Sequence, residues 1–266
     1  MKFVSFPRFT VRLLVVAIFV LMLAGCGGSS NLGLTQGNWA FSATSTAAAK
    51  ISGPTFVLGG SLTQSGTSLT GTMYVTQSGC IPQQFVTFTG TVKDKNVTLT
   101  SASFGGEVIS VTASGTKDSL SGTYAVTGEC ADSGTVTASA VPSISATWNG
   151  TISNPVSGSS GLGIAEATLS VALLQAATAS EDGTFALSGT LTYTNSVCSV
   201  SGTIANGFLA GNFISFSAST DDGTGTVLYD RVLLDSVTAP KNMTGTYDAS
   251  SDACGEQQLA LTLTKQ

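Results

Sequence analysis

Hydrophobic and polar residues alternate along most of the chain after residue 30. Leu69, Met73 and Val75 share one parity with Gly71, while threonines fill most of the intervening positions. The same period of two recurs over residues 86–92, 185–193 and 259–263. An alternation of this kind is typical of antiparallel strands with one buried face. The pattern therefore predicts an all-β protein.

Short turn signals separate the alternating segments. They are Ser65-Gly66, Lys93-Asp94-Lys95-Asn96, Asp182-Gly183, Asn206-Gly207 and Asp222-Gly223. Sequences rich in Gly, Asn and Asp mark turns, and their spacing predicts about eight strands in each half of the chain. Such strands must hide their edges by closing into an up-and-down barrel or by folding into a two-layer sandwich. The hairpin-like turns favour antiparallel meander barrels, with β-sandwiches as the alternative.

The chain also repeats itself in three places that keep the same order. Residues 70–80 align with residues 188–198 without a gap, and each segment ends in a cysteine. A Gly-Thr-Tyr run at 122–124 precedes Cys130, as another at 245–247 precedes Cys254. The two tryptophans, Trp39 and Trp148, each open one unit. These landmarks predict a duplication, with one β domain over 37–141 and a second over 144–266.

The first 25 residues have the pattern of a secretory signal peptide. Lys2, Arg8 and Arg12 precede an apolar stretch from Leu13 to Leu23. That stretch is much shorter than the roughly 20 residues that a membrane-spanning helix needs.

The run Leu23-Ala24-Gly25-Cys26 resembles the lipobox of bacterial lipoproteins. The resemblance implies cleavage before Cys26 and a lipid on Cys26, with residues 26–36 as a lipidated tether. It also implies a place in the bacterial cell envelope, where the lipid anchors the protein to a membrane. We expect the outer membrane, with the protein facing the periplasm or the cell surface.

Composition narrows the classes of function. Loss of residues 1–25 leaves 7 basic residues against 15 acidic ones, a net charge of −8. Because the chain has no basic patch, we expect no binding to nucleic acid. The chain has no histidine, which excludes Ser-His-Asp and Cys-His catalysis and any His-ligated metal site. Chemistry based on carboxylates, a Ser-Lys pair or Tyr stays open, but the sequence contains no recognisable nucleophile constellation. We therefore expect a protein without enzymatic activity, cofactor or metal.

Four cysteines remain after Cys26, and four cysteines allow three pairings. The duplication selects Cys80 with Cys130 and Cys198 with Cys254, one pair in each unit. A secreted chain meets an oxidising compartment, where disulfides persist. The spacings are far from those of a Cys-x-x-Cys zinc site.

Three further features are candidates for binding chemistry. Gly37-Asn38-Trp39 resembles the Gly-x-Trp signature of lipocalins, which implies a Trp that closes one end of an eight-stranded barrel; the same ring would equally serve as an aromatic cap on a β core. Arg231, the sole Arg after Cys26, has the strand parity of Tyr229 and Leu233, which would let it bind an anionic group inside a barrel. An ion pair at the surface is the other interpretation.

The acidic runs Asp221-Asp222-Gly223 and Glu181-Asp182-Gly183 offer oxygen atoms to a calcium ion, but their spacing differs from that of the calcium-binding loop. Tight turns explain these runs better. The same two interpretations, with the same preference, apply to Asp248 and Asp252 near Cys254. The sequence thus predicts a non-catalytic envelope module that binds a small ligand or glycan in a barrel mouth. The alternative is a structural or adhesive surface protein.

Overall fold

The computed structural model describes residues 31–46, 55–153, 167–196, 199–221, 227–236, 241–251 and 255–266, and nearly all of the regular structure in them is strand. The signal peptide and Cys26 lie outside the described residues. In the part of the chain that the structure describes, no helical segment has the length and hydropathy to cross a membrane.

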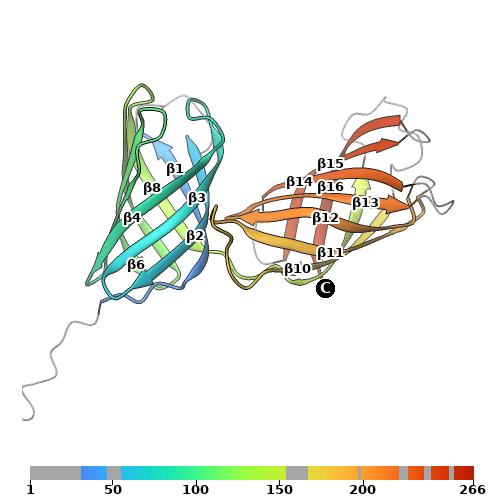
Figure 1. Ribbon diagram of the computed structural model, residues 1–266, viewed down its shortest axis with the longest axis horizontal. Helices are drawn as coiled ribbons and strands as arrows, with labels where there is room; N and C mark the ends of the chain where they lie inside the picture. Colours follow the sequence, from blue (N-terminus) through green and yellow to red (C-terminus); the bar gives the residue numbers. More distant parts are fainter. Residues whose placement is uncertain are drawn as a thin grey trace, which may run out of the picture. The chain divides into compact units, whose positions relative to one another are not determined.

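Sixteen strands form two closed antiparallel barrels, and within each barrel every strand pairs with its neighbour in sequence (Figure 1). Barrel 1 consists of β1 (Gly37–Ser45), β2 (Phe56–Ser65), β3 (Ser68–Ser78), β4 (Phe85–Lys93), β5 (Asn96–Ser101), β6 (Val108–Thr116), β7 (Ser119–Thr127) and β8 (Asp132–Ala140). Barrel 2 consists of β9 (Ala146–Ser153), β10 (Thr168–Gln175), β11 (Phe185–Thr194), β12 (Ser201–Ala210), β13 (Phe213–Asp221), β14 (Val227–Ser236), β15 (Asn242–Ser251) and β16 (Gly255–Lys265).

Closure of each sheet comes from pairing between its first and last strands. In barrel 1, β1 pairs with β8 in a register that sets Trp39 opposite Ala140. In barrel 2, β9 pairs with β16, with Ile152 opposite Leu261. Closure leaves no free sheet edge. The predicted all-β meander barrels are thus confirmed, and the sandwich alternative is wrong.

The alternating hydrophobic and polar residues of each strand face the inside and the outside of the barrel, respectively. In β3, Leu69, Met73 and Val75 are buried, while the threonines between them face outward or are half-buried. Leu259, Leu261 and Leu263 of β16 are likewise buried in barrel 2. Each barrel holds one continuous hydrophobic core, because every second side chain of every strand points inward.

One predicted turn is wrong. Asn206-Gly207 lies inside β12, where the pairing with β13 shifts register between Ile204 and Asn206. A β-bulge adds one residue to one strand and bends it, and it uses the same small, turn-favouring residues as a hairpin. The β12–β13 turn lies further along, at Gly211. Asp222-Gly223 lies outside the described residues.

The two tryptophans occupy matching positions in the two barrels. Trp39 is completely buried, and its Nε1 donates to the carbonyl oxygen of Thr35, four residues earlier, at 2.7 Å. Trp148 is buried as well, and its Nε1 donates to the carbonyl oxygen of Ile144 at 2.9 Å. The Lys265 ammonium lies 5.7 Å from the centre of the Trp148 ring, within cation–π range. Both rings thus act as aromatic caps on a β core.

Asn38 makes a contact that joins the barrels, which belong to one compact unit over Leu32–Gln266. Its side chain is buried; Nδ2 donates to the Gly211 carbonyl at 2.9 Å, and Oδ1 accepts from the Gly211 N–H at 2.7 Å. Gly211 has a φ of 59°, and a Cβ there would come within 2.6 Å of Gly59 Cα. A glycine is therefore required for this close approach. Nearby, the Tyr74 ring lies 6.0 Å from both Phe208 and Phe213.

Candidate functional site

The two ends of barrel 1 differ, and the difference locates the candidate site. The chain enters at one end, where Leu34 is buried beneath the barrel and Leu32 N–H donates to the Asp94 carbonyl at 2.7 Å. Gln64 Oε1 accepts from the Leu34 N–H at 2.8 Å. We call this the entry end. The segment before β1 crosses the entry end and closes it with an apolar side chain.

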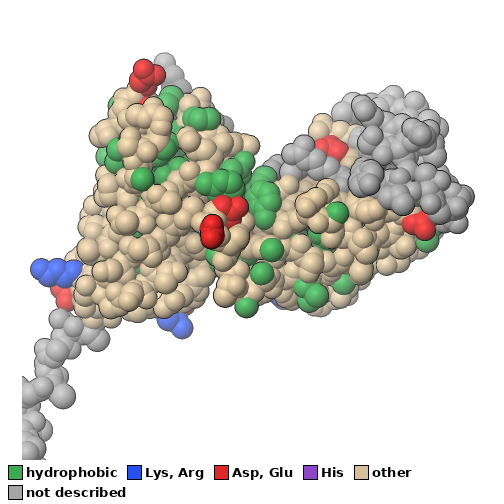
Figure 2. All heavy atoms as spheres, in the orientation of Figure 1, with side chains coloured by type: hydrophobic (Ala, Val, Ile, Leu, Met, Phe, Trp, Pro, Cys, Tyr) green, Lys and Arg blue, Asp and Glu red, His purple; other side chains and the backbone are tan. Residues whose placement is uncertain are grey.

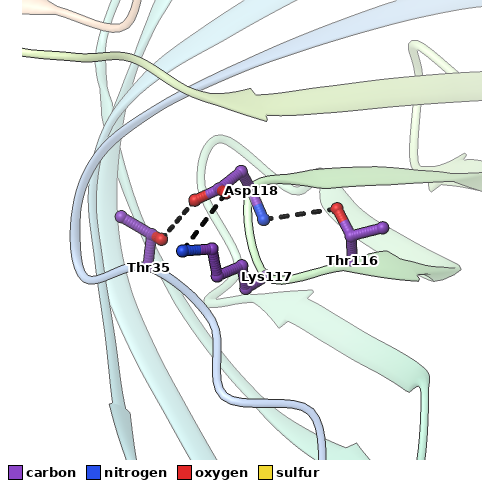
Figure 3. A network of polar contacts seen from close by, with 4 residues as sticks. All are labelled: Thr35, Thr116, Lys117 and Asp118. Carbon is purple, nitrogen blue, oxygen red and sulfur yellow. Dashed lines mark hydrogen bonds and ion pairs between the residues drawn. The ribbon is translucent and has the colours of Figure 1, made fainter.

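A polar network fastens that segment to the β6–β7 turn (Figure 3). Thr35 donates from Oγ1 to the Asp118 carboxylate, and its N–H donates to the Lys117 carbonyl at 2.8 Å. The Lys117 ammonium lies 3.8 Å from Asp118, and both side chains are more than half exposed. An ion pair this exposed contributes little stability. The backbone hydrogen bonds therefore hold the segment in place, and the ion pair adds little to its stability.

The opposite end of barrel 1 contains a cavity of about 730 Å³. We call this end the mouth. Its walls come from the end of β1, the start of β2, the β3–β4 loop and the β7–β8 turn. The lining residues are Ser45, Thr55, Phe56, Gln77, Ser78, Gly79, Cys80, Ile81, Val126, Glu129, Cys130, Ala131 and Asp132. The volume lies within the usual range for small-molecule sites, which are mainly apolar and carry a few placed polar groups.

A disulfide ties two of these walls together. Cys80 follows β3 and Cys130 precedes β8, and the bond between them joins strands on separate parts of the barrel wall. The pairing predicted from the duplication is therefore present in barrel 1. Ser78 Oγ accepts from the Ile81 N–H at 2.9 Å, and Ile81 is buried against the core. The β3–β4 loop is thus folded inward over the mouth and held there covalently.

Asp132 is the most organised polar group of the mouth. Its carboxylate accepts from Ser45 Oγ at 2.6 Å and from the Tyr124 hydroxyl at 2.5 Å. Burial by itself would raise the pKa of Asp132, but hydrogen bonds from Ser45, Tyr124 and the Ser133 N–H outweigh it and lower the pKa. Burial and the bond to Asp132 raise the pKa of Tyr124 to about 12. Asp132 is therefore ionised and Tyr124 is neutral at pH 7.

Behind the β7–β8 turn lies a second carboxylate, Glu107. It is only 6% exposed, and Oε1 accepts from the Cys130 N–H at 3.0 Å, while Oε2 is buried without a hydrogen bond in the described structure. Gly128 has a φ of 122°, and a Cβ there would approach Glu107 Oε2 to 2.5 Å. The glycine leaves room for the carboxylate beside the turn. Sequence reasoning missed Glu107, because nothing local marks it.

Barrel 2 contains a pair of buried tyrosines. Tyr247 occupies the repeat position of Tyr124, and its hydroxyl lies 3.0 Å from that of Tyr193. Both tyrosines are buried. Tyr193 stands where the first unit has Val75, so this contact between two tyrosines is specific to the second unit. Cys198 and Cys254 lie outside the described residues.

The remaining candidates from the sequence do not gather at the mouth. Arg231 lies in barrel 2, in β14, opposite Ser217 and Asp248, and its side chain lies outside the described part of the structure.

Asp182 lies in a tight turn, as the sequence suggested. It accepts from Ser180 Oγ at 2.7 Å and from the Thr184 N–H at 3.0 Å. Burial would raise its pKa, but these bonds lower it. Asp248 accepts from Gln258 Nε2 at 3.2 Å, whereas Asp222 and Asp252 lie outside the described residues. Among the described residues, no three His, Cys, Asp or Glu side chains form a metal-binding group.

Comparisons with known proteins add little to this site. No protein family model matches the chain, and no curated protein matches it. Among solved structures, it is similar to intact Ap-TbpB (N and C lobes), with 9% identity, 89% of this chain and 78% of that chain covered, and a TM-score of 0.23. It is also similar to a double mutant of Transferrin Binding Protein B (TbpB) from Haemophilus parasuis Hp5, with 10% identity, coverages of 89% and 77%, and a TM-score of 0.24. Overlaps at this level do not establish a shared fold.

Proposed function

We propose that this protein is a lipid-anchored envelope protein of bacteria that binds a small ligand in the mouth of barrel 1 without catalysing a reaction. The observation that carries the proposal is the cavity of about 730 Å³ at the mouth. Phe56, Ile81 and Val126 supply its apolar surface, and Ser45 and Asp132 supply polar groups. Because the rest of barrel 1 is filled by its own core, the ligand would sit at the mouth and not deep inside.

A lipid anchor on Cys26 would leave the mouth of barrel 1 accessible to a ligand. The chain first contacts barrel 1 at Leu32, at the entry end. Cys26 and Leu32 are six residues apart, so the intervening chain can extend over about 20 Å at most. A lipid on Cys26 would therefore hold the entry end near the membrane, and the mouth would open on the side that faces away from it.

The surface is consistent with a partner other than nucleic acid. On the face shown in Figure 2, charged side chains are few and scattered, and backbone and side chains that are neither charged nor hydrophobic cover most of the surface. Phosphate recognition requires clustered Lys and Arg. A ligand held by apolar contacts and a few hydrogen bonds suits this surface better.

Fragment binding followed by NMR tests the proposal. We expect neutral fragments with an apolar ring to shift the resonances of mouth residues in the chain from Gly27 to Gln266, which contains every described residue. Ala131→Phe places a ring in the mouth and should abolish these shifts. Ala125→Phe is the matched control, since Ala125 is exposed on the outer face of β7. If no fragment shifts the mouth residues, or if Ala131→Phe leaves binding intact, the mouth is not a ligand site.

A structural or adhesive role is the second candidate. The interiors of both barrels are filled with side chains, and Phe85 is 44% exposed beside Tyr74, at a ring separation of 4.8 Å. An adhesive surface would use the exposed ring of Phe85. Phe85→Ser would then weaken attachment to envelope material and leave fragment binding at the mouth unchanged.

A further inference from the structure

We infer that the mouth of barrel 1 selects a cationic ligand, namely a small molecule with an apolar body and a protonated amine or quaternary ammonium group. The inference rests on the proposed function, because it specifies the ligand of that same cavity. Its basis is the combination of an apolar cavity with the distribution of charge between the two ends of barrel 1.

The described cations of barrel 1 all lie at the entry end. Lys93 is the last residue of β4, Lys95 lies in the β4–β5 turn, and Lys117 lies in the β6–β7 turn. Asp94 and Asp118 share these two turns, so the charges at the entry end nearly cancel. Nothing at this end favours a ligand of either sign.

The mouth has the opposite character. Glu129 and Asp132 line the cavity, and Glu107 lies directly behind the β7–β8 turn, bonded to the backbone of Cys130. Among the described residues, no Lys or Arg lines the cavity or forms an ion pair with these three carboxylates. Within the part of the chain that the structure describes, the cavity is thus lined and backed by carboxylates and by no cation.

The polar groups of the cavity match a donor ligand. An ionised carboxylate only accepts hydrogen bonds and has about four lone-pair sites. Asp132 uses three of them for Ser45, Tyr124 and the Ser133 N–H, which fixes its orientation and leaves one acceptor site. Glu129 is exposed at the rim. A ligand ammonium would satisfy these acceptors, whereas a ligand carboxylate would meet like charge in a partly enclosed space, where repulsion is stronger than in bulk water.

Three compounds of the same shape separate the contribution of charge from that of the apolar body. They are 4-phenylbutylamine, 4-phenylbutanol and 4-phenylbutyrate, titrated into the chain from Gly27 to Gln266 at pH 7 and low salt. We expect the amine to bind about fivefold more tightly than the alcohol, which is the upper range for exposed ion pairs, and the butyrate to bind most weakly. High salt shortens the Debye length to a few ångström and should remove most of the amine's advantage.

Variants identify the carboxylates responsible. In a Glu129→Gln, Asp132→Asn double variant, the amine should bind no more than about twofold more tightly than the alcohol. The single variant Glu129→Gln removes an exposed charge and leaves the Ser45–Asp132–Tyr124 hydrogen bonds intact. It therefore keeps the test valid if the double variant folds poorly. We expect it to reduce the amine's advantage over the alcohol in part. Asp118→Asn at the entry end is the matched control and should leave all three affinities unchanged.

The possible outcomes separate this inference from the proposed function. If the alcohol binds at the mouth but the amine binds no more tightly, the site takes neutral ligands; the charge inference fails and the proposed function stands. The same holds if the butyrate binds most tightly, or if the amine keeps its full advantage in Glu129→Gln and in the double variant. If none of the three compounds binds, both proposals fail.

Discussion

Removal of the Cys80–Cys130 disulfide gives the sharpest test of how barrel 1 is stabilised. The bond closes a loop of 50 residues that contains strands β4 to β7. In the chain-entropy model, a cross-link of this span lowers the entropy of the unfolded chain enough to stabilise the fold by about 4 kcal/mol. We expect a Cys80→Ser, Cys130→Ser double variant to lose about that much free energy of unfolding. The variant should still fold, because the core of barrel 1 is complete without the bond.

The tryptophans allow the measurement to be made on barrel 1 alone. Trp39 and Trp148 are the two tryptophans of the chain, and each is buried in its own barrel. In a Trp148→Phe background, fluorescence during urea unfolding reports Trp39. The disulfide variant and its parent are compared in this background by linear extrapolation. The denaturant slope should rise slightly in the variant, because its unfolded chain is less constrained.

Two results would refute the reasoning. A loss below about 1 kcal/mol would mean that the unfolded chain keeps these segments close without the bond, so that the loop length does not measure the entropy. A variant that fails to fold would mean that the bond forms part of the native structure of the mouth and does more than restrain the unfolded chain. The reduced parent protein, measured without mutation, should lose the same free energy as the double variant.

Three further outcomes follow from the sequence and the structure. Cys26→Ser should abolish metabolic labelling with a fatty acid and release the protein from membranes; label that persists would contradict the lipobox assignment. Peptide mapping without reductant should find Cys198 linked to Cys254, and any link between the two halves would contradict the pairing. Because the pKa of Tyr124 is raised in the fold, the stability that Tyr124 contributes is complete below pH 10 and is lost as the pH rises toward 12; Tyr124→Phe should flatten this alkaline loss in urea titrations from pH 8 to 12.

Much of the fold is already determined by the sequence. The period of two identifies which face of each strand is buried, as at Leu69 and Met73 in β3 and at Leu187 and Leu191 in β11. This works because adjacent side chains of a strand point to opposite sides whatever the strand pairs with. The duplication predicts the pairing of Cys80 with Cys130, because each repeat unit contains two of the four cysteines and each pair can form within one unit.

The tertiary structure alone decides the features that depend on distant segments. Asn206-Gly207 has the composition of a turn, but pairing with β13 makes it a bulge. Asn38 looks like part of a local signature, yet its side chain is buried against Gly211, 173 residues away. Neither outcome follows from nearby residues.

The candidate site has the same origin. The mouth forms where the ends of β1 and β2 meet the β3–β4 loop and the β7–β8 turn once β1 and β8 pair and close the barrel. Glu107 lies beside it only because the β5–β6 and β7–β8 connections are on the same side of the barrel. Alternation is a property of one strand and can be read residue by residue. A cavity is a property of closure, because its walls come together only when backbone hydrogen bonds join strands that lie about a hundred residues apart in the chain.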